Sequence, residues 1–305
     1  MSPRAAGIVL VAVSAASFGA MAIFARLAYD GGADVTAVLF LRFAIAAPCM
    51  AAVMRLRGLA WPRGPVLAGL AAMGGIGYVG QSLSYFTALT LASASLVALL
   101  LYAYPAIVTV LSVLVLGARL TRLRVAALGL ALAGAALTIG PELSGEPLGV
   151  VLGASAAVIY SAYILVGSRL TPRSGALPAS AVVMAAAAAV FAVVVAVQRP
   201  SFPSTAGSWA AVVAIALVST VVAITTFFAG MARLGAPDAS TLSTLEPVVT
   251  VALAAAVLDE RLAPAQLAGG VLILAAVVVL ARAPAPEAVP LTSTPTPTPT
   301  PTKPA

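Results

Sequence analysis

A carboxylate interrupts an apolar run near the end of the chain. The stretch STLSTLEPVVTVALAAAVLDERL (residues 240–262) carries Glu246 directly before Pro247. If this run is a membrane helix, a charge at its centre costs about 2.5–3.5 kcal/mol, which gains of about 0.3–0.6 kcal/mol from each Leu, Ile, Phe or Val can offset. Such residues usually face a bundle interior or a water-filled cavity. Glu246 is therefore a candidate to contact a solute or carry a proton, unless a neighbouring helix merely satisfies it.

Four polar side chains share one face of an earlier apolar run. The spacing 0, 3, 4 and 7 is that of a helical face and relates Tyr78, Gln81, Ser82 and Tyr85. Because a polar stripe should avoid lipid, it either lines a cavity or makes interhelical hydrogen bonds, each worth about 0.6 kcal/mol. We include Tyr78, Gln81 and Tyr85 among the predicted substrate-binding residues.

Three further candidates are uncharged. Ser243 precedes Glu246 by three residues and should share its helical face. Tyr104 occupies the position that matches Glu246 in the internal repeat described below, so it offers a hydroxyl where the other copy offers a charge. Tyr160 is the third, with the alternative that it anchors a helix at the membrane interface, where tyrosines are enriched.

Arg42 lies about eight residues inside another apolar run. Its guanidinium is a candidate to bind an anionic group of a solute or to balance the charge of Glu246. The alternatives are that it extends outward to the membrane interface, or that it pairs with Asp30 or Asp34 near the end of the run.

The composition is that of an integral membrane protein. Of 305 residues, 62% are hydrophobic and 8% charged, against roughly 45–50% and about 25% in soluble domains. The chain has no histidine and one cysteine, which leaves little material for metal sites, disulfides or Ser-His-Asp catalysis. We expect no catalytic residue, metal or cofactor. The net charge of +7 is scattered among short gaps, so we expect no nucleic-acid partner.

Ten apolar segments are long enough to cross a bilayer, which takes about 20 helical residues. They lack the alternation of a barrel, and the predicted fold is an all-α membrane protein with helices near 7–28, 34–54, 65–87, 92–116, 124–140, 148–168, 178–197, 207–231, 239–257 and 265–281. The first segment also resembles a cleaved signal peptide. Its full-length copy at 149–168 argues that it belongs to the fold.

Basic residues predict the orientation. With the N-terminus in the cytoplasm, twelve Lys and Arg residues fall inside and only Arg26, Arg199 and Arg261 outside, with Arg42 within a helix. Both termini are therefore predicted to be cytoplasmic, in the plasma membrane (the inner membrane of a bacterium). Residues 283–305 form a Pro/Thr-rich segment that should be a disordered cytoplasmic tail.

The chain is an internal duplication. An offset of 142 residues holds from Gly7/Gly149 through Pro105/Pro247 to Leu120/Leu262. The predicted units are 7–140 and 148–282, each with five spans. Because five is odd, the second unit enters the membrane from the opposite face, and such inverted repeats allow a central site to open to each side in turn.

The same segments carry a family resemblance. FLRFAIAA (40–47), YFTALTLASASLVALLLYAYPAIVTVLSVLVLGARL (85–120) and FFAGMARLGAPDASTLSTLEPVVTVALAAAVLDERL (227–262) resemble the tandem EamA repeats of the drug/metabolite transporter superfamily. The resemblance implies ten helices, cytoplasmic termini and transport of small metabolites, commonly export. The first copy departs from the family by reading GAR rather than GER at 117–119, so any charge role there survives only in 259–261.

The resulting prediction is a carrier that exports a small amphipathic solute, such as an amino acid or a related compound, by alternating access. Glu246 is predicted to couple this export to protons. The expected partners are the solute and the lipid bilayer, and the sequence favours no particular oligomeric state. An intramembrane enzyme is one alternative, although the chain has no GxSxG motif. A non-transporting membrane scaffold is the other, and it would tolerate leucine at Gln81 and Glu246.

Overall fold

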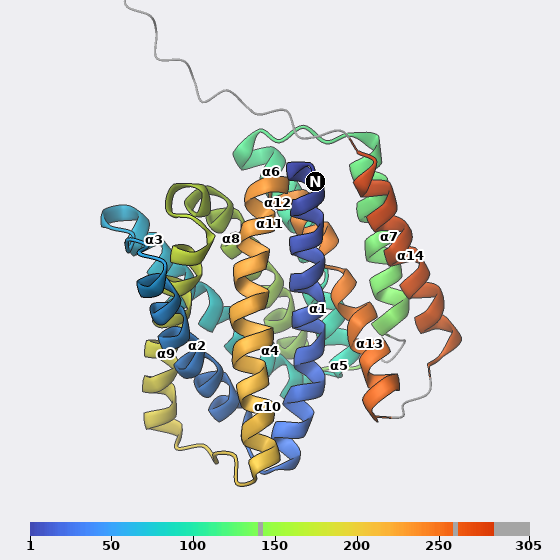
Figure 1. Ribbon diagram of the computed structural model, residues 1–305. Helices are drawn as coiled ribbons and strands as arrows, with labels where there is room; N and C mark the ends of the chain where they lie inside the picture. Colours follow the sequence, from blue (N-terminus) through green and yellow to red (C-terminus); the bar gives the residue numbers. More distant parts are fainter. Residues whose placement is uncertain (140–142, 259–261, 284–305) are drawn as a thin grey trace, which may run out of the picture.

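The computed structural model describes residues 1–139, 143–258 and 262–283, and these fold into a bundle of helices (Figure 1). The elements are α1 (Pro3–Asp30), α2 (Val35–Leu56), α3 (Gly64–Ala72), η1 (Met73–Tyr78), α4 (Val79–Leu91), α5 (Ala94–Leu101), α6 (Tyr104–Leu116), α7 (Arg122–Ile139), α8 (Pro147–Ser174), α9 (Ala176–Gln198), α10 (Ala206–Ala216), η2 (Leu217–Val222), α11 (Ala223–Leu234), α12 (Ala236–Leu242), α13 (Leu245–Leu258) and α14 (Pro264–Ala281).

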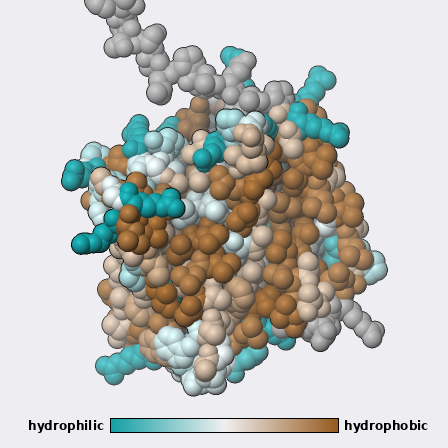
Figure 2. All heavy atoms as spheres, in the orientation of Figure 1, coloured by the Kyte–Doolittle hydropathy of each residue, from teal (hydrophilic) through white to brown (hydrophobic). Residues whose placement is uncertain are grey.

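Together these elements make ten candidate spans of 18 to 29 residues in the described part of the chain, which confirms the predicted fold class. On the face shown in Figure 2, apolar side chains cover the middle of the molecule, and hydrophilic ones gather at its two ends, most densely at the end where the N-terminus lies. This is the surface expected of a protein whose middle faces lipid, because apolar side chains carry the favourable transfer energy.

Four of the spans are not continuous α-helices. The third and eighth each contain a π-helical turn, η1 and η2. The fourth and ninth spans are each interrupted, at residues 102–103 and 243–244. Each interruption lies a few residues before a proline, Pro105 or Pro247. Proline cannot donate the backbone hydrogen bond that would continue the earlier helix. Both kinds of irregularity recur in both halves at nearly the 142-residue offset.

The two halves interlock rather than lie side by side. Helix α1 of the first half packs against α11 and α13 of the second, and the equivalent α8 packs against α4 and α6 of the first. The same exchange pairs α2 with α9 and α7 with α14. Each pairing therefore has its counterpart in the other half, which is the packing that an inverted repeat produces.

Both ends of the described chain lie on the same side of the bundle, where α1 begins and α14 ends (Figure 1). The Arg4 guanidinium, at the start of α1, donates a 2.7 Å hydrogen bond to the carbonyl oxygen of Leu280. We call this end of the bundle the N-terminal side and the opposite end the far side. An even number of spans requires this placement. Residues 259–261 and 284–305, with the predicted charge cluster and nearly all of the predicted tail, lie outside the described residues.

Two aspartates, Asp34 and Asp238, lie at the start of helices, and neither side chain caps its helix. Asp34 is the N-cap residue of α2 but makes no side-chain cap hydrogen bond, and its carboxylate instead accepts one from the Ser201 amide at 2.7 Å. Asp238 lies within the first turn of α12, whose N-cap is Gly235. Its carboxylate forms ion pairs with two arginines that the helix pattern alone could not reveal.

Helices α7 and α14 approach at a pair of glycines, and this contact supports a stability prediction. A Cβ added at Gly134 would lie 2.7 Å from the carbonyl oxygen of Gly269, a backbone atom that cannot rotate away. A Cβ at Gly129, also in α7, would meet nothing within 4 Å. We expect Gly134→Ala to destabilise the protein by about 1–3 kcal/mol, as overpacking does. Gly129→Ala should be neutral or stabilising by about 0.5–1 kcal/mol because alanine favours the helix.

Thermal unfolding of the two purified variants in the same detergent measures this difference. Equal unfolding temperatures for both variants would show that the α7–α14 contact tolerates separation.

Candidate functional site

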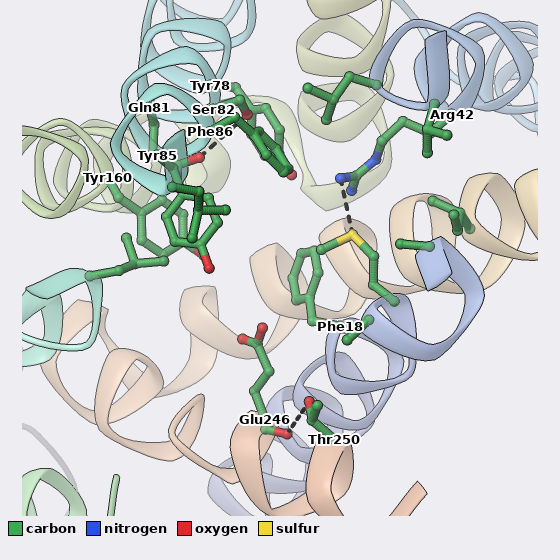
Figure 3. Close-up of a pocket in the computed structure, with 18 of the residues that line it drawn as sticks. Phe18, Arg42, Tyr78, Gln81, Ser82, Tyr85, Phe86, Tyr160, Glu246 and Thr250 are labelled. Carbon is green, nitrogen blue, oxygen red and sulfur yellow. Dashed lines mark hydrogen bonds between the residues drawn. The ribbon is translucent and has the colours of Figure 1, made fainter. Parts of the chain in front are cut away.

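A cavity of about 370 Å³ lies between the two halves, and Figure 3 shows it from inside the bundle. Its walls come from α1, α2, η1, α4, α5, α6, α8, α10 and α13. Most of the lining is apolar or aromatic. The polar and charged groups are contributed by Tyr29, Arg42, Tyr78, Gln81, Ser82, Tyr85, Tyr102, Tyr104, Tyr160, Glu246 and Thr250.

Glu246 stands at the second position of α13, just after the helix break, and its carboxylate points into the cavity (Figure 3). A hydrogen bond from the Glu246 amide to the Ser243 carbonyl, 3.0 Å long, spans the break. Tyr102, at the break in the fourth span, lines the same cavity. The two interrupted spans thus present their most polar groups to each other across the cavity.

Close backbone packing fixes the position of Glu246. A Cβ added at Gly19 of α1 would lie 2.7 Å from the Glu246 carbonyl oxygen. The Thr250 hydroxyl donates to both the Gly19 carbonyl at 3.0 Å and the Glu246 carbonyl at 3.1 Å. Glycine at position 19 therefore lets α1 approach α13 closely enough for a hydroxyl to join their backbones.

The first half repeats this arrangement with different residues. The 142-residue offset relates Gly19 to Ser161 and Glu246 to Tyr104. The Ser161 hydroxyl, in α8, donates a 3.3 Å hydrogen bond to the Tyr104 carbonyl. Tyr104 begins α6 just after its break, as Glu246 nearly begins α13. The same backbone contact thus holds a tyrosine on one side of the cavity and a carboxylate on the other.

Four tyrosine rings contact one another in a chain, and three of them, Tyr78, Tyr104 and Tyr160, line the cavity. Tyr104 and Tyr160 meet edge to face with ring centroids 4.8 Å apart, and Tyr160 stacks on Tyr163 at 5.9 Å. Tyr163 in turn meets Tyr78 at 5.9 Å. The Tyr104 hydroxyl donates a 3.4 Å hydrogen bond to the Ser240 carbonyl. Rings held in such a chain lose little further freedom when a solute packs against them.

Arg42 lies on the opposite wall, 3% exposed. Its Nε donates to the Thr220 hydroxyl at 3.0 Å and one terminal nitrogen donates to the Ser219 carbonyl at 3.1 Å, both within η2. The other terminal nitrogen contacts the Met21 sulfur at 3.1 Å (Figure 3). The guanidinium also lies 4.9 Å from the Phe43 ring centroid. A π-helical turn departs from the usual bonding pattern, and turns of this kind are frequent at functional sites.

The profile of the EamA-like transporter family matches residues 5–140 and again residues 147–282. The chain belongs to this family. A crystal structure described only as "Crystal structure of protein" matches the fold with a TM-score of 0.81 and 24% sequence identity, over 90% of this chain and 96% of that one. No curated protein matches.

As a member of the EamA-like family, the protein is a multi-pass membrane transporter of the drug/metabolite transporter superfamily. The family model covers both repeats and so confirms the resemblance that the sequence motifs carried.

Seven of the eight predicted binding residues line the cavity: Glu246, Gln81, Tyr85, Tyr78, Tyr104, Arg42 and Tyr160. Their role in binding a solute stays a prediction. Ser243 is buried outside the lining, and its hydroxyl donates to the Ala239 carbonyl at 3.0 Å. In a continuous helix Ser243 and Glu246 would share one face. The break at 243–244 separates the two residues, so they do not share a helical face.

Arg42 departs from both of its expected pairings. Among the described residues it makes no ion pair with Asp30, Asp34 or Glu246, and its donors are directed to η2 and Met21 instead. Sequence reasoning also missed the contributions of Met21, Phe18 and Thr220. The first two look like ordinary apolar residues of a span, and only a polar pair inside the apolar run at 219–220 signalled the third.

Proposed function

We propose that this transporter exports a small amphipathic solute, with its N-terminal side in the cytoplasm, by alternating access coupled to protons at Glu246. The observation that carries the proposal is a carboxylate pointing into a cavity between two inverted halves (Figure 3). A group there is exposed to whichever side the cavity opens. Rocking of the halves would carry its proton, or a solute bound in its place, from one face of the membrane to the other.

The chemistry of the walls supports the choice of solute. Aromatic rings attract a cationic group by cation–π interaction within about 6 Å of the ring, and the carboxylate of Glu246 adds a negative charge when it is ionised. Tyr102, Tyr104 and Tyr160 surround the space in front of it. Arg42 is positioned on another wall, where it suits an anionic or carbonyl group. An amino acid or a related compound with an apolar body satisfies all three features.

The pseudo-symmetry supports alternating access. Helices of each half pack against the other half, and equivalent backbone contacts recur at Gly19–Glu246 and Ser161–Tyr104. Two arrangements related by exchange of the halves would therefore have similar packing, as a carrier requires. The charge on one side only, at Glu246, gives the two arrangements different affinities for a proton and so allows coupling.

The test begins with metabolites in the medium and in cells that overexpress the chain. A solute enriched in the medium is then offered to proteoliposomes with and without an imposed proton gradient. We expect saturable uptake that the gradient accelerates and an uncoupler abolishes. Uptake that ignores the gradient would exclude proton coupling, and the absence of any solute-dependent flux or thermal shift would favour a scaffold. Chemical turnover of the solute in detergent would indicate an enzyme.

A further inference from the structure

A second group of charged residues lies outside the cavity lining, on the N-terminal side of the bundle, and has no part in the proposed transport chemistry. The Asp238 carboxylate, 3% exposed, accepts hydrogen bonds from Arg124 Nε at 2.8 Å and from a terminal nitrogen of Arg4 at 3.1 Å. Arg124 adds a second contact at 3.4 Å. The other terminal nitrogen of Arg4 donates to the Leu280 carbonyl. We call Arg4, Arg124 and Asp238 the ionic cluster.

The cluster joins helices that are far apart in the chain. Arg4 lies in the first turn of α1, Arg124 in the first turn of α7, Asp238 in α12 and Leu280 in the last turn of α14. All four elements meet on the N-terminal side of the bundle (Figure 1). The contacts span 234 and 114 residues of sequence and connect the first, fifth, ninth and tenth spans. The cluster is therefore a tie between the halves, since α1 and α7 belong to one and α12 and α14 to the other.

The cavity lies in the other direction. Its lining includes Tyr29 at the end of α1, Val38 near the start of α2 and Leu89 near the end of α4, all toward the far side. On α1, Arg4 and Phe18, the first residue of that helix to line the cavity, are 14 residues apart, about 21 Å at 1.5 Å per residue. Helix α12 lies between the cluster and the cavity and is tightly packed there. Ser240 is fully buried, and its carbonyl accepts a hydrogen bond from the Tyr104 hydroxyl.

The cluster exists in one half of the pseudo-symmetric structure only. The 142-residue offset relates Arg4, Arg124 and Asp238 to Glu146, Gln266 and Leu96. Leucine cannot form an ion pair, and the Gln266 side chain accepts a hydrogen bond from the Ala263 amide at the start of its own helix. The equivalent position on the far side thus has no such tie, although the helices that would carry it are present.

We propose that the ionic cluster is a latch that holds the N-terminal side of the carrier closed and biases it toward the state that opens to the far side. Opening the N-terminal side moves α12 away from α1 and α7. That movement separates a buried carboxylate from both of its guanidinium partners, which then need water in their place. Opening the far side also breaks hydrogen bonds between the halves, such as that from the Ser201 amide to Asp34, but no buried ion pair among the described residues. The latch therefore adds a free-energy difference between the two access states.

Cysteine labelling measures the bias directly and needs no solute. Cys49 is the chain's one cysteine, so Cys49→Ala gives a background for single reporters. Ser240→Cys places a near-isosteric thiol between the latch and the cavity. In inverted vesicles a membrane-impermeant maleimide reaches the N-terminal side, and the labelling rate reports how often that side opens. We expect Asp238→Asn, which keeps the size and removes the charge, to raise this rate at least about tenfold.

A second reporter separates a shift between states from general loosening. Leu89→Cys lines the cavity toward the far side. In right-side-out vesicles its labelling rate should stay level or fall in Asp238→Asn, because opening the N-terminal side depopulates the other state. A rise at both reporters would mean that the variant has merely loosened the bundle, and this would overturn the latch.

Two further variants keep the proposal testable if Asp238→Asn folds poorly. Arg4→Gln removes the more exposed of the two cations, 17% exposed, and should raise Ser240→Cys labelling by a smaller factor than Asp238→Asn. Asp34→Asn removes a carboxylate on the far side that bonds the Ser201 amide and should leave labelling unchanged. If folded Arg4→Gln and Asp238→Asn both label at the parent rate, the cluster serves packing and the proposal is wrong.

Discussion

Glu246→Gln is expected to abolish gradient-driven transport while the protein still inserts and folds. Glutamine nearly matches the volume of the acid and keeps a polar group in the cavity, but it cannot exchange a proton. The backbone contacts that position residue 246 involve its carbonyl and amide, which the substitution retains. Uptake of the identified solute into inverted vesicles with an imposed proton gradient measures the effect.

Counterflow in the absence of a gradient shows what else the carboxylate does. Retained exchange in Glu246→Gln would indicate a proton carrier that does not contact the solute, and loss of exchange would add solute binding to its role. Glu246→Asp is the matched control, because it keeps the acid and should keep part of the coupled uptake. Full proton-driven uptake by the glutamine variant would remove the coupling proposal.

The number and type of helices were predictable from the sequence because lipid imposes a simple constraint. A span must supply about 20 apolar residues and satisfy its own backbone, and ten segments of the chain meet that requirement. The duplication added the arrangement of the halves, since a constant offset leaves few ways to pack five spans against their inverted copy. Helix ends were less certain. The eighth span, for example, extends to Leu234, whereas hydropathy ended it at residue 231.

The helix breaks and the charged contacts were less accessible. The prolines at 105 and 247 indicated weakened helices. They did not indicate that the break at 243–244 would place Ser243 and Glu246 on different helical faces. Asp238 follows a proline and precedes an apolar run, a local pattern that suggests a cap. Its real partners are 234 and 114 residues away, and no local pattern encodes contacts at that separation. Arg42 likewise takes its partners from η2, an irregular turn that hydropathy does not reveal.

Comparing equivalent positions of the two repeats identifies individual residue contacts, which composition cannot do, and Gly19 is an example. Position 19 holds glycine where its equivalent, position 161, holds serine. A serine fits against α6 because its hydroxyl bonds the Tyr104 carbonyl. Against α13 the approach is closer, and a Cβ would lie 2.7 Å from the Glu246 carbonyl and 2.9 Å from Val249 Cβ. The residue facing the charged copy therefore has no room for a side chain.

Gly19→Val is consequently expected to reduce transport at least about tenfold even where the protein remains folded. The added side chain pushes α1 from α13, displaces Glu246 and breaks the bond from Thr250 to the Gly19 carbonyl. Overpacking costs about 1–3 kcal/mol, and 1.4 kcal/mol is tenfold in an equilibrium constant. Initial uptake rates, normalised to the folded carrier in the proteoliposomes, measure the loss.

Gly80→Val provides the matched control for this prediction. Gly80 lies beside Gln81 in α4, yet a Cβ there would meet nothing within 4 Å. The same substitution in the same part of the bundle should therefore keep most of the activity. If Gly19→Val transported as well as Gly80→Val, the α1–α13 contact would not be what positions Glu246. The carboxylate would then have to be held by its side-chain contacts in the cavity, with Tyr102 as the first residue to replace.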